Sequence, residues 1–122
     1  MSVVREAIRE LLKSHPEIFP SKAGHTVHLE RYRTTGNVNI GFEPDRINHQ
    51  NLYVEAAAVR LTNLIDIQHR LYLACNYHIS RPNHHLFHKH AFAEVDILRF
   101  QIHELWQAVR VITEVAGTGS RL

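Results

Sequence analysis

The spacing of apolar residues changes along the chain, and this change restricts the fold more than any other feature. At the N-terminus a helix over 2–14 is predicted by apolar residues at the spacing of one helix face: Val4, Ile8, Leu11 and Leu12. A second helix, over 103–116, is predicted by the same kind of spacing: Leu105, Val109, Ile112 and Ala116. Gly117 is expected to follow the end of this helix, because glycine readily takes the left-handed conformation found there.

Between these helices the apolar period falls to two, which is typical of strands. Two alternating runs, 26–33 and 37–42, flank the turn-forming sequence Thr34-Thr35-Gly36-Asn37. They predict a β-hairpin over 26–42. The alternation assigns one side of the hairpin to the core and leaves four residues on its exposed face: His28, Glu30, Tyr32 and Asn39.

Three further stretches have the character of strands. A strand over 51–56 is expected, followed by irregular or short helical structure through Ile67, although the alanines 56–58 leave a single helix over 51–69 open. A short strand is expected over 70–75. The run 91–102 is apolar on both faces at Ile97 and Leu98, which favours a central strand.

These elements together predict an α+β fold. We expect a small antiparallel or mixed sheet of three to five strands, with an N-terminal and a C-terminal helix packed on it. A chain of 122 residues, 44% hydrophobic and 21% charged, is expected to form one globular domain, residues 1–122. No apolar run approaches the roughly 18 residues of a membrane span, and charges near the N-terminus argue against a signal peptide. A soluble, cytoplasmic protein without membrane contact is therefore expected.

The segment 69–90 has the most unusual composition, and we call it the histidine-rich segment. It holds His69, His78, His84, His85, His88 and His90, out of eleven histidines in the chain, and it contains no Asp or Glu. Histidines begin to gain charge near pH 6.5, so mild acid would make this segment strongly positive. Its part 76–90 is polar and interrupted by Pro82, which predicts a loop.

Binding of nucleic-acid phosphates is the function that this composition favours most. The cations would contact phosphates and the aromatic residues would stack on bases. The candidate binding residues are Arg70, Tyr77, Arg81, Asn83, His84, His85, His88, Lys89 and His90. Arg31, Arg33 and Lys22 would extend the surface if the sheet brings them near. The net charge of only +2 and the lack of a known nucleic-acid-binding motif weigh against this hypothesis.

A metal-dependent hydrolase or nuclease is an alternative, because imidazole is a common ligand of zinc and other divalent transition metals. The candidate ligands are His84, His88 and His90, but no HExxH sequence or cysteine pair supports them. Pro44-Asp45 followed by Glu55 resembles the first half of a nuclease motif, yet Ala57 stands where that motif needs a lysine. No nucleophile elbow or glycine-rich phosphate loop is present, so a non-catalytic role without a resident cofactor is favoured.

A protein-interaction module, such as a regulator or inhibitor of a larger complex, is the other alternative. Trp106 and Tyr53 would be candidate anchors if they were exposed, although their periodicity favours the core. An exposed edge of the sheet could also pair two copies into a homodimer. The possible partners are therefore DNA or RNA, another protein, or a second copy of the chain.

Overall fold

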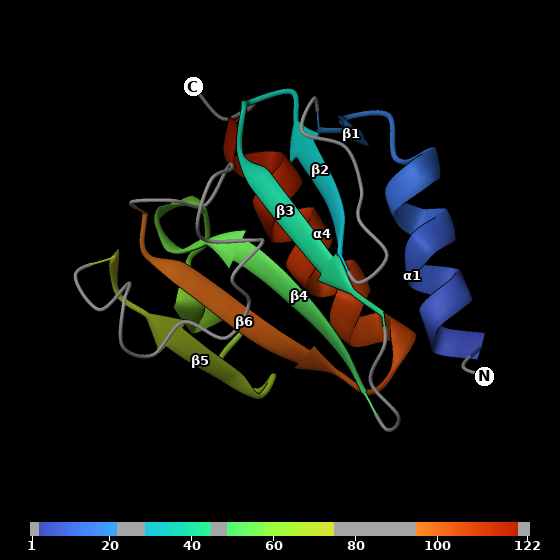
Figure 1. The fold of residues 1–122 in the computed structure, drawn as a ribbon. Helices are drawn as coiled ribbons and strands as arrows, with labels where there is room; N and C mark the ends of the chain where they lie inside the picture. The colour runs from blue at the N-terminus through green and yellow to red at the C-terminus, as the bar shows by residue number, and fades with distance from the viewer. Residues whose placement is uncertain (1–2, 22–28, 45–48, 75–94, 120–122) are drawn as a thin grey trace.

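Figure 1 shows the computed structural model, which describes residues 3–21, 29–44, 49–74 and 95–119. The elements in chain order are α1 (Val3–Ser14), β1 (Ile18–Pro20), β2 (Glu30–Thr34), β3 (Asn39–Glu43), β4 (Gln50–Glu55), η1 (Ala56–Ala58), η2 (Leu61–Asn63), β5 (His69–Tyr72), β6 (Ile97–Ile102) and α4 (Leu105–Gly119). The helices at the two ends and the strands between them confirm the predicted α+β fold, with N- and C-terminal helices packed on a sheet.

The strands form one open antiparallel sheet in the order β1-β2-β3-β4-β6-β5. It has six strands, more than the three to five expected. The strand that the sequence did not indicate is β1, a three-residue strand that pairs with β2. Because it occupies the edge, β1 tolerates Pro20, which cannot donate to a ladder. The expected central strand is β6, which lies between β4 and β5.

For residues 51–69 the sequence left two predictions open, and the structure confirms the first, a strand followed by short helical structure. β4 ends at Glu55, and two short 3-10 helices, η1 and η2, lead toward β5 instead of one long helix over 51–69. β4 is buried along nearly its whole length, and its register with β3 and β6 places Leu52 and Val54 on the same side as the helices. Pairing on both sides therefore keeps residues 50–55 extended.

The main core lies between the sheet and the two helices. It combines Ile8 and Leu12 of α1, buried residues of α4, and alternate residues of β2, β3, β4 and β6. The sheet contributes Tyr32, Ile40, Phe42, Leu52, Val54, Leu98, Phe100 and Ile102. Side chains alternate along a strand, so residues between these positions face the other way. We call that second side the opposite face; it holds a smaller buried cluster of Leu29, Tyr53 and Ile97, against which Val95 packs.

The predicted hairpin is confirmed as β2 and β3, but its predicted exposed face is wrong for two of the four residues. Glu30 and Tyr32 point toward the helices, and Tyr32 is buried in the main core. The reason is a polar network between α1 and β2. Arg9 contacts Glu30 at 2.6 and 2.7 Å, and the Tyr32 hydroxyl donates to the same carboxylate at 2.7 Å. Asn39 lies on the opposite face, and His28 lies outside the described residues.

This network is expected to be a significant source of stability. Replacing Glu30 with Gln removes the charge that Arg9 and Tyr32 both contact, which should lower the free energy of unfolding by about 1–3 kcal/mol. Denaturant titration of both proteins measures the difference. Glu10→Gln, an exposed change on α1, is the matched control and should stay within about 0.5 kcal/mol of the parent. Equal losses in the two variants would mean that the network contributes nothing specific.

The C-terminal helix is confirmed, but its predicted end is wrong, and only Ile112 and Ala116 of its predicted apolar stripe are buried. The buried residues are Ala108, Val111, Ile112, Val115 and Ala116, whereas Leu105 and Val109 are exposed. Gly117 does not follow the helix, because α4 continues through Gly119. Packing of Val115 and Ala116 against the core stabilises this last turn in spite of the glycine. Within the described ranges, no helix is long and apolar enough to cross a membrane.

Candidate functional site

Of the nine candidate nucleic-acid-binding residues, the structure describes only Arg70. The others, Tyr77, Arg81, Asn83, His84, His85, His88, Lys89 and His90, lie outside the described residues, and so do all three candidate metal ligands. What the structure does describe is the base of the histidine-rich segment, where the chain leaves the sheet before residue 75 and returns to it after residue 94. The candidate site is therefore built from these flanking strands.

The segment is carried on two neighbouring antiparallel strands. Tyr72 of β5 is the register partner of Ile97 of β6, so the chain leaves and re-enters the sheet at the same end (Figure 1). The Ala74 backbone N–H donates to the Asp96 carboxylate at 2.8 Å, which joins the two chain ends just beyond the last strand pair. This arrangement brings Ala74 and Asp96 together although they lie 22 positions apart in the sequence.

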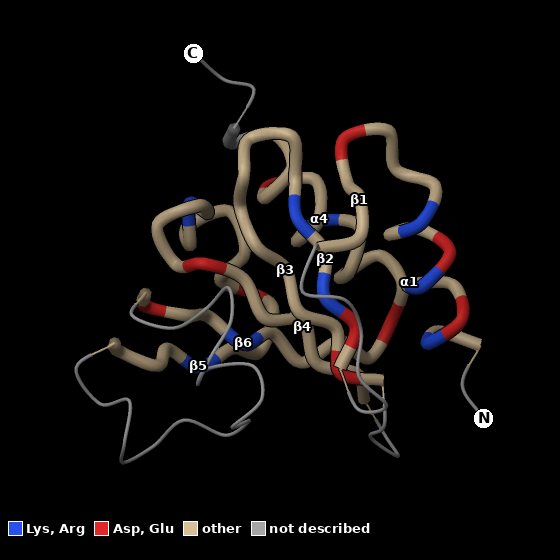
Figure 2. The backbone as a smooth tube through the Cα atoms, turned by 45° about the horizontal axis from the view of Figure 1, so that its top comes forward, with Lys and Arg blue, Asp and Glu red and all other residues tan. Residues whose placement is uncertain are grey.

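Arg70 and Arg99 lie directly opposite each other on these two strands (Figure 2). Both face the side away from the helices, and both guanidinium groups lie over the ring of Tyr72, at 4.9 Å for Arg70 and 5.8 Å for Arg99. Among the described residues, no carboxylate forms an ion pair with either arginine. Like charges directly opposite in a sheet are destabilising, so this pair of cations favours a bound anion.

Arg99 was not among the residues predicted from the sequence. The available signal was the strand period, since Arg99 must face away from the neighbouring core residues Leu98 and Phe100. Its partner could not be identified, because the pairing of β5 with β6 is not encoded locally.

The other arginines of the predicted patch lie on the same face but farther along the sheet. Arg31 of β2 is separated from Arg99 by the intervening positions Gly41 and Tyr53 of β3 and β4. Burial lowers the pKa of Arg31. Arg33 lies over the ring of Phe19, 5.1 Å from its centre. Arg31 is buried, so of these two arginines only Arg33 extends the positive charge of the opposite face across the sheet.

Polar side chains between the arginines are already bonded to one another. The Glu43 carboxylate accepts hydrogen bonds from Asn51 at 2.8 Å and from the Tyr53 hydroxyl at 3.1 Å. Burial, and next the negative charge of Glu43, raise the pKa of Tyr53 far above its usual value. Tyr53 is fully buried, so it is not a candidate anchor for a protein partner. Glu43, Asn51 and Tyr53 hold β3 and β4 together.

His69 has a structural place at the edge of the sheet. Its Nδ1 donates to the Ile67 carbonyl at 2.8 Å, and its ring lies 5.9 Å from that of Phe100. In the described parts of the chain, no group of three or more His, Cys, Asp or Glu residues could hold a metal ion. Glu55, from the partial nuclease motif, accepts two hydrogen bonds of 2.8 Å from Asn39.

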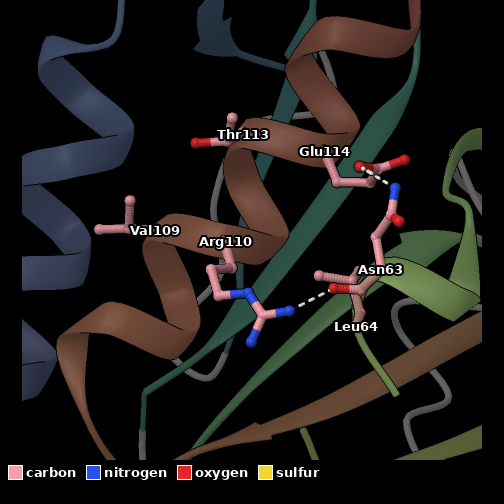
Figure 3. A pocket seen from close by; sticks show the side chains of 6 residues that line it. All are labelled: Asn63, Leu64, Val109, Arg110, Thr113 and Glu114. Carbon is pink, nitrogen blue, oxygen red and sulfur yellow. Dashed lines mark hydrogen bonds between the residues drawn. The ribbon is translucent and has the colours of Figure 1, made fainter. Parts of the chain in front are cut away.

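A surface pocket of about 270 Å³ lies on the helix side of the molecule (Figure 3). It is lined by Asn63, Leu64, Val109, Arg110, Thr113 and Glu114. The charged side chains that line the pocket already form hydrogen bonds and ion pairs with other residues of the chain. Arg110 donates to the Asn63 carbonyl and to Asp66, and Glu114 accepts from Asn63 at 3.2 Å and from Arg60. These hydrogen bonds and ion pairs connect the η2 region to α4.

The start of α4 presents apolar side chains to solvent. Trp106 is 45% exposed, with Arg110 5.7 Å from the centre of its ring, and Leu105 and Val109 are exposed beside it. The expectation that Trp106 belongs to the core is therefore wrong. The apolar residues of α4 occupy more than one helix face, and the sheet covers the face that carries Ala108 and Val111.

The histidine-rich segment therefore starts from a pair of arginines on a tyrosine ring, and a separate apolar surface lies on α4. No protein-family model, curated protein or solved structure matches this chain. Its function has to be inferred from these two surfaces.

Proposed function

We propose that the chain binds the phosphate backbone of a nucleic acid, without catalysis, through the histidine-rich segment and the arginines at its base. The observation that carries this proposal is the Arg70–Arg99 pair. Two cations lie on adjacent strands, against one aromatic ring, and no ion pair within the described part of the chain neutralises them. A phosphate between them would relieve their repulsion and would gain charge-assisted hydrogen bonds.

The position of this pair supports the proposal in a second way. The acid-free segment begins at His69 of β5, the strand that carries Arg70, and the same segment contains the cations Arg81 and Lys89. The five histidines after His69 in the same segment would add positive charge below about pH 6.5, which would strengthen binding to phosphates in mild acid. The candidate contacts are therefore Arg99 together with the nine residues predicted from the sequence.

The test is a titration of labelled single- and double-stranded DNA and RNA with tag-free protein, followed by fluorescence anisotropy. Salt is varied from about 20 to about 150 mM, with and without a chelator, and log affinity should fall linearly with log salt. Binding that disappears with the chelator would favour the metal-dependent alternative. No binding to any nucleic acid at the lowest salt would contradict the proposal.

Arg70→Gln is expected to weaken binding about three- to tenfold at low salt, because one phosphate contact is lost. The slope of log affinity against log salt should fall by about 0.7–0.9 for the same reason. Lys13→Gln is the matched control: it removes one positive charge from exposed α1 and should leave both quantities unchanged. Equal weakening by the two variants would show that net charge, and no particular site, governs binding.

A protein-interaction module is the second candidate, and the exposure of Trp106 favours it. Tryptophan is enriched among the residues that dominate interface energetics, and Leu105 and Val109 widen the apolar surface around it. This function predicts that Trp106→Ala abolishes partner binding while leaving nucleic-acid titrations unchanged.

A further inference from the structure

β5 forms one edge of the sheet, and its outer side has no strand partner among the described residues. β5 pairs only with β6 there. The other edge strand, β1, is three residues long and ends in Pro20, two features that protect an edge from further pairing. β5 contains no proline. Its outer backbone groups can therefore accept another strand.

One hydrogen bond defines which groups of β5 point outward. The Gln101 N–H donates to the Gln68 carbonyl at 2.9 Å, so Gln68 and Gln101 form a hydrogen-bonded pair. In antiparallel strands such pairs alternate with non-hydrogen-bonded ones. Arg70 and Tyr72 consequently direct their backbone groups toward β6. His69 and Leu71 direct their N–H and C=O groups to the outer edge.

The side chains next to these outward groups are apolar. Leu71 is 50% exposed and lies on the side of the sheet that carries the helices, and Leu73, just beyond the end of β5, is 38% exposed. Leucines on an open strand edge favour association, since burial of their exposed surface adds to the new hydrogen bonds. The backbone and the side chains of this edge thus point to the same kind of partner, an added strand.

We propose that a second copy of the chain adds its β5 antiparallel to this edge, with the two-fold axis at Leu71. This register pairs Leu71 with the partner's Leu71, and His69 with the partner's Leu73. The Leu71 pair provides two hydrogen bonds, and extension of each β5 by one residue, to Leu73, adds the two His69–Leu73 pairs, which gives about six hydrogen bonds between the copies. The two sheets become one continuous sheet.

The charges of β5 favour a two-fold axis at Leu71 over the adjacent register, with the axis at Arg70. With the axis at Leu71, Arg70 lies opposite the partner's Tyr72, in a pair whose side chains approach closely because it is not hydrogen-bonded. Arg70 already lies over the ring of Tyr72 in its own strand, so this contact suits both side chains. An axis at Arg70 would place two arginines directly opposite each other, which is unfavourable.

Sedimentation equilibrium of the full chain, from about 10 μM to about 1 mM, tests the proposal. The parent is expected to dimerise, and Leu71→Lys is expected to raise the dissociation constant at least about tenfold, because two lysines would then face each other. Ile65→Lys, which changes an exposed apolar residue outside β5, is the matched control and should dimerise like the parent. A monomeric parent at every concentration, or equal weakening by both lysines, would overturn the proposal.

Hydrogen exchange followed by NMR identifies the interface itself. The amides of His69, Leu71 and Leu73 should become protected as the protein concentration rises, while those of Arg70 and Tyr72 should be protected at every concentration. Far-UV circular dichroism establishes that Leu71→Lys is folded. A dimer whose outward β5 amides exchange at the same rate at all concentrations would place the interface elsewhere and would overturn the proposal.

Discussion

Raising the pH from about 9 to about 11.5 is expected to lower the free energy of unfolding by roughly 4 kcal/mol through Tyr32 and Tyr53 alone. Both side chains are buried in the folded state, and burial is the main reason why both have raised pKa values. Each also donates a hydrogen bond to a glutamate, Tyr32 to Glu30 and Tyr53 to Glu43, which raises the pKa further.

The sign follows from which state loses protons first. In the unfolded chain these tyrosines ionise near pH 10, whereas in the folded protein they stay neutral to higher pH. Above pH 10 the unfolded state therefore binds fewer protons, and stability falls by about 1.4 kcal/mol per pH unit for each tyrosine. Below pH 10 their contribution is constant, and it is lost as the pH rises toward their folded-state pKa values.

Urea titrations at intervals between pH 9 and 11.5 measure this slope, with Tyr53→Phe as the informative variant. The variant loses the hydrogen bond to Glu43, so it should be less stable at pH 9, but its stability should fall with pH about half as steeply through these groups. Tyr32→Phe should behave in the same way. A slope that both replacements leave unchanged would show that neither hydroxyl is kept neutral by folding.

Phe100→Ala is expected to cost about 3–5 kcal/mol of stability, the range for removing a fully buried aromatic side chain. Phe100 is fully buried at the middle of β6, opposite Leu52 of β4 on one side and His69 of β5 on the other. Its loss would leave a cavity where three strands meet beneath the helices. The free energy of unfolding of a natural domain is only about 5–15 kcal/mol, so the variant should be only marginally stable.

Thermal and urea unfolding measure this cost. Val109→Ala, an exposed change on α4, serves as the control and should cost less than about 1 kcal/mol. The pair also tests which face of α4 is covered, because the sequence pattern put Val109 on the same apolar helix face as Ile112 and Ala116. A larger loss for Val109→Ala than for Phe100→Ala would contradict the packing described above.

The spacing of apolar residues was enough to locate the helices and strands. It was less reliable for predicting which face of each element is buried. The two helices, the β2–β3 hairpin, β4 and β6 all follow from runs of period 3.6 or two. Tyr32 was assigned to solvent because it alternates with Leu29, but both are buried, on opposite faces of the sheet. A strand covered on both faces does not separate apolar from polar positions, so alternation alone cannot orient it.

The candidate site was only partly predictable for a different reason. Composition identified the histidine-rich segment and Arg70, because a stretch without acids is visible in the sequence alone. Arg99 joins the site through the β5–β6 register, a long-range pairing that local residues do not specify. In α4 the residues Leu105 and Val109 form as good a stripe as Ala108 and Val111, and only the tertiary contacts decide between them.

The strand order also has a consequence for how the chain folds. β6 lies between β4 and β5, so the centre of the sheet pairs residues 50–55 with residues 97–102, far apart in the sequence. The chain must close this long loop before the pairing stabilises it, which is an entropic cost that slows folding. α4, the last element described, supplies much of the main core. A chain emerging from the ribosome therefore cannot complete its core until α4 has been synthesised.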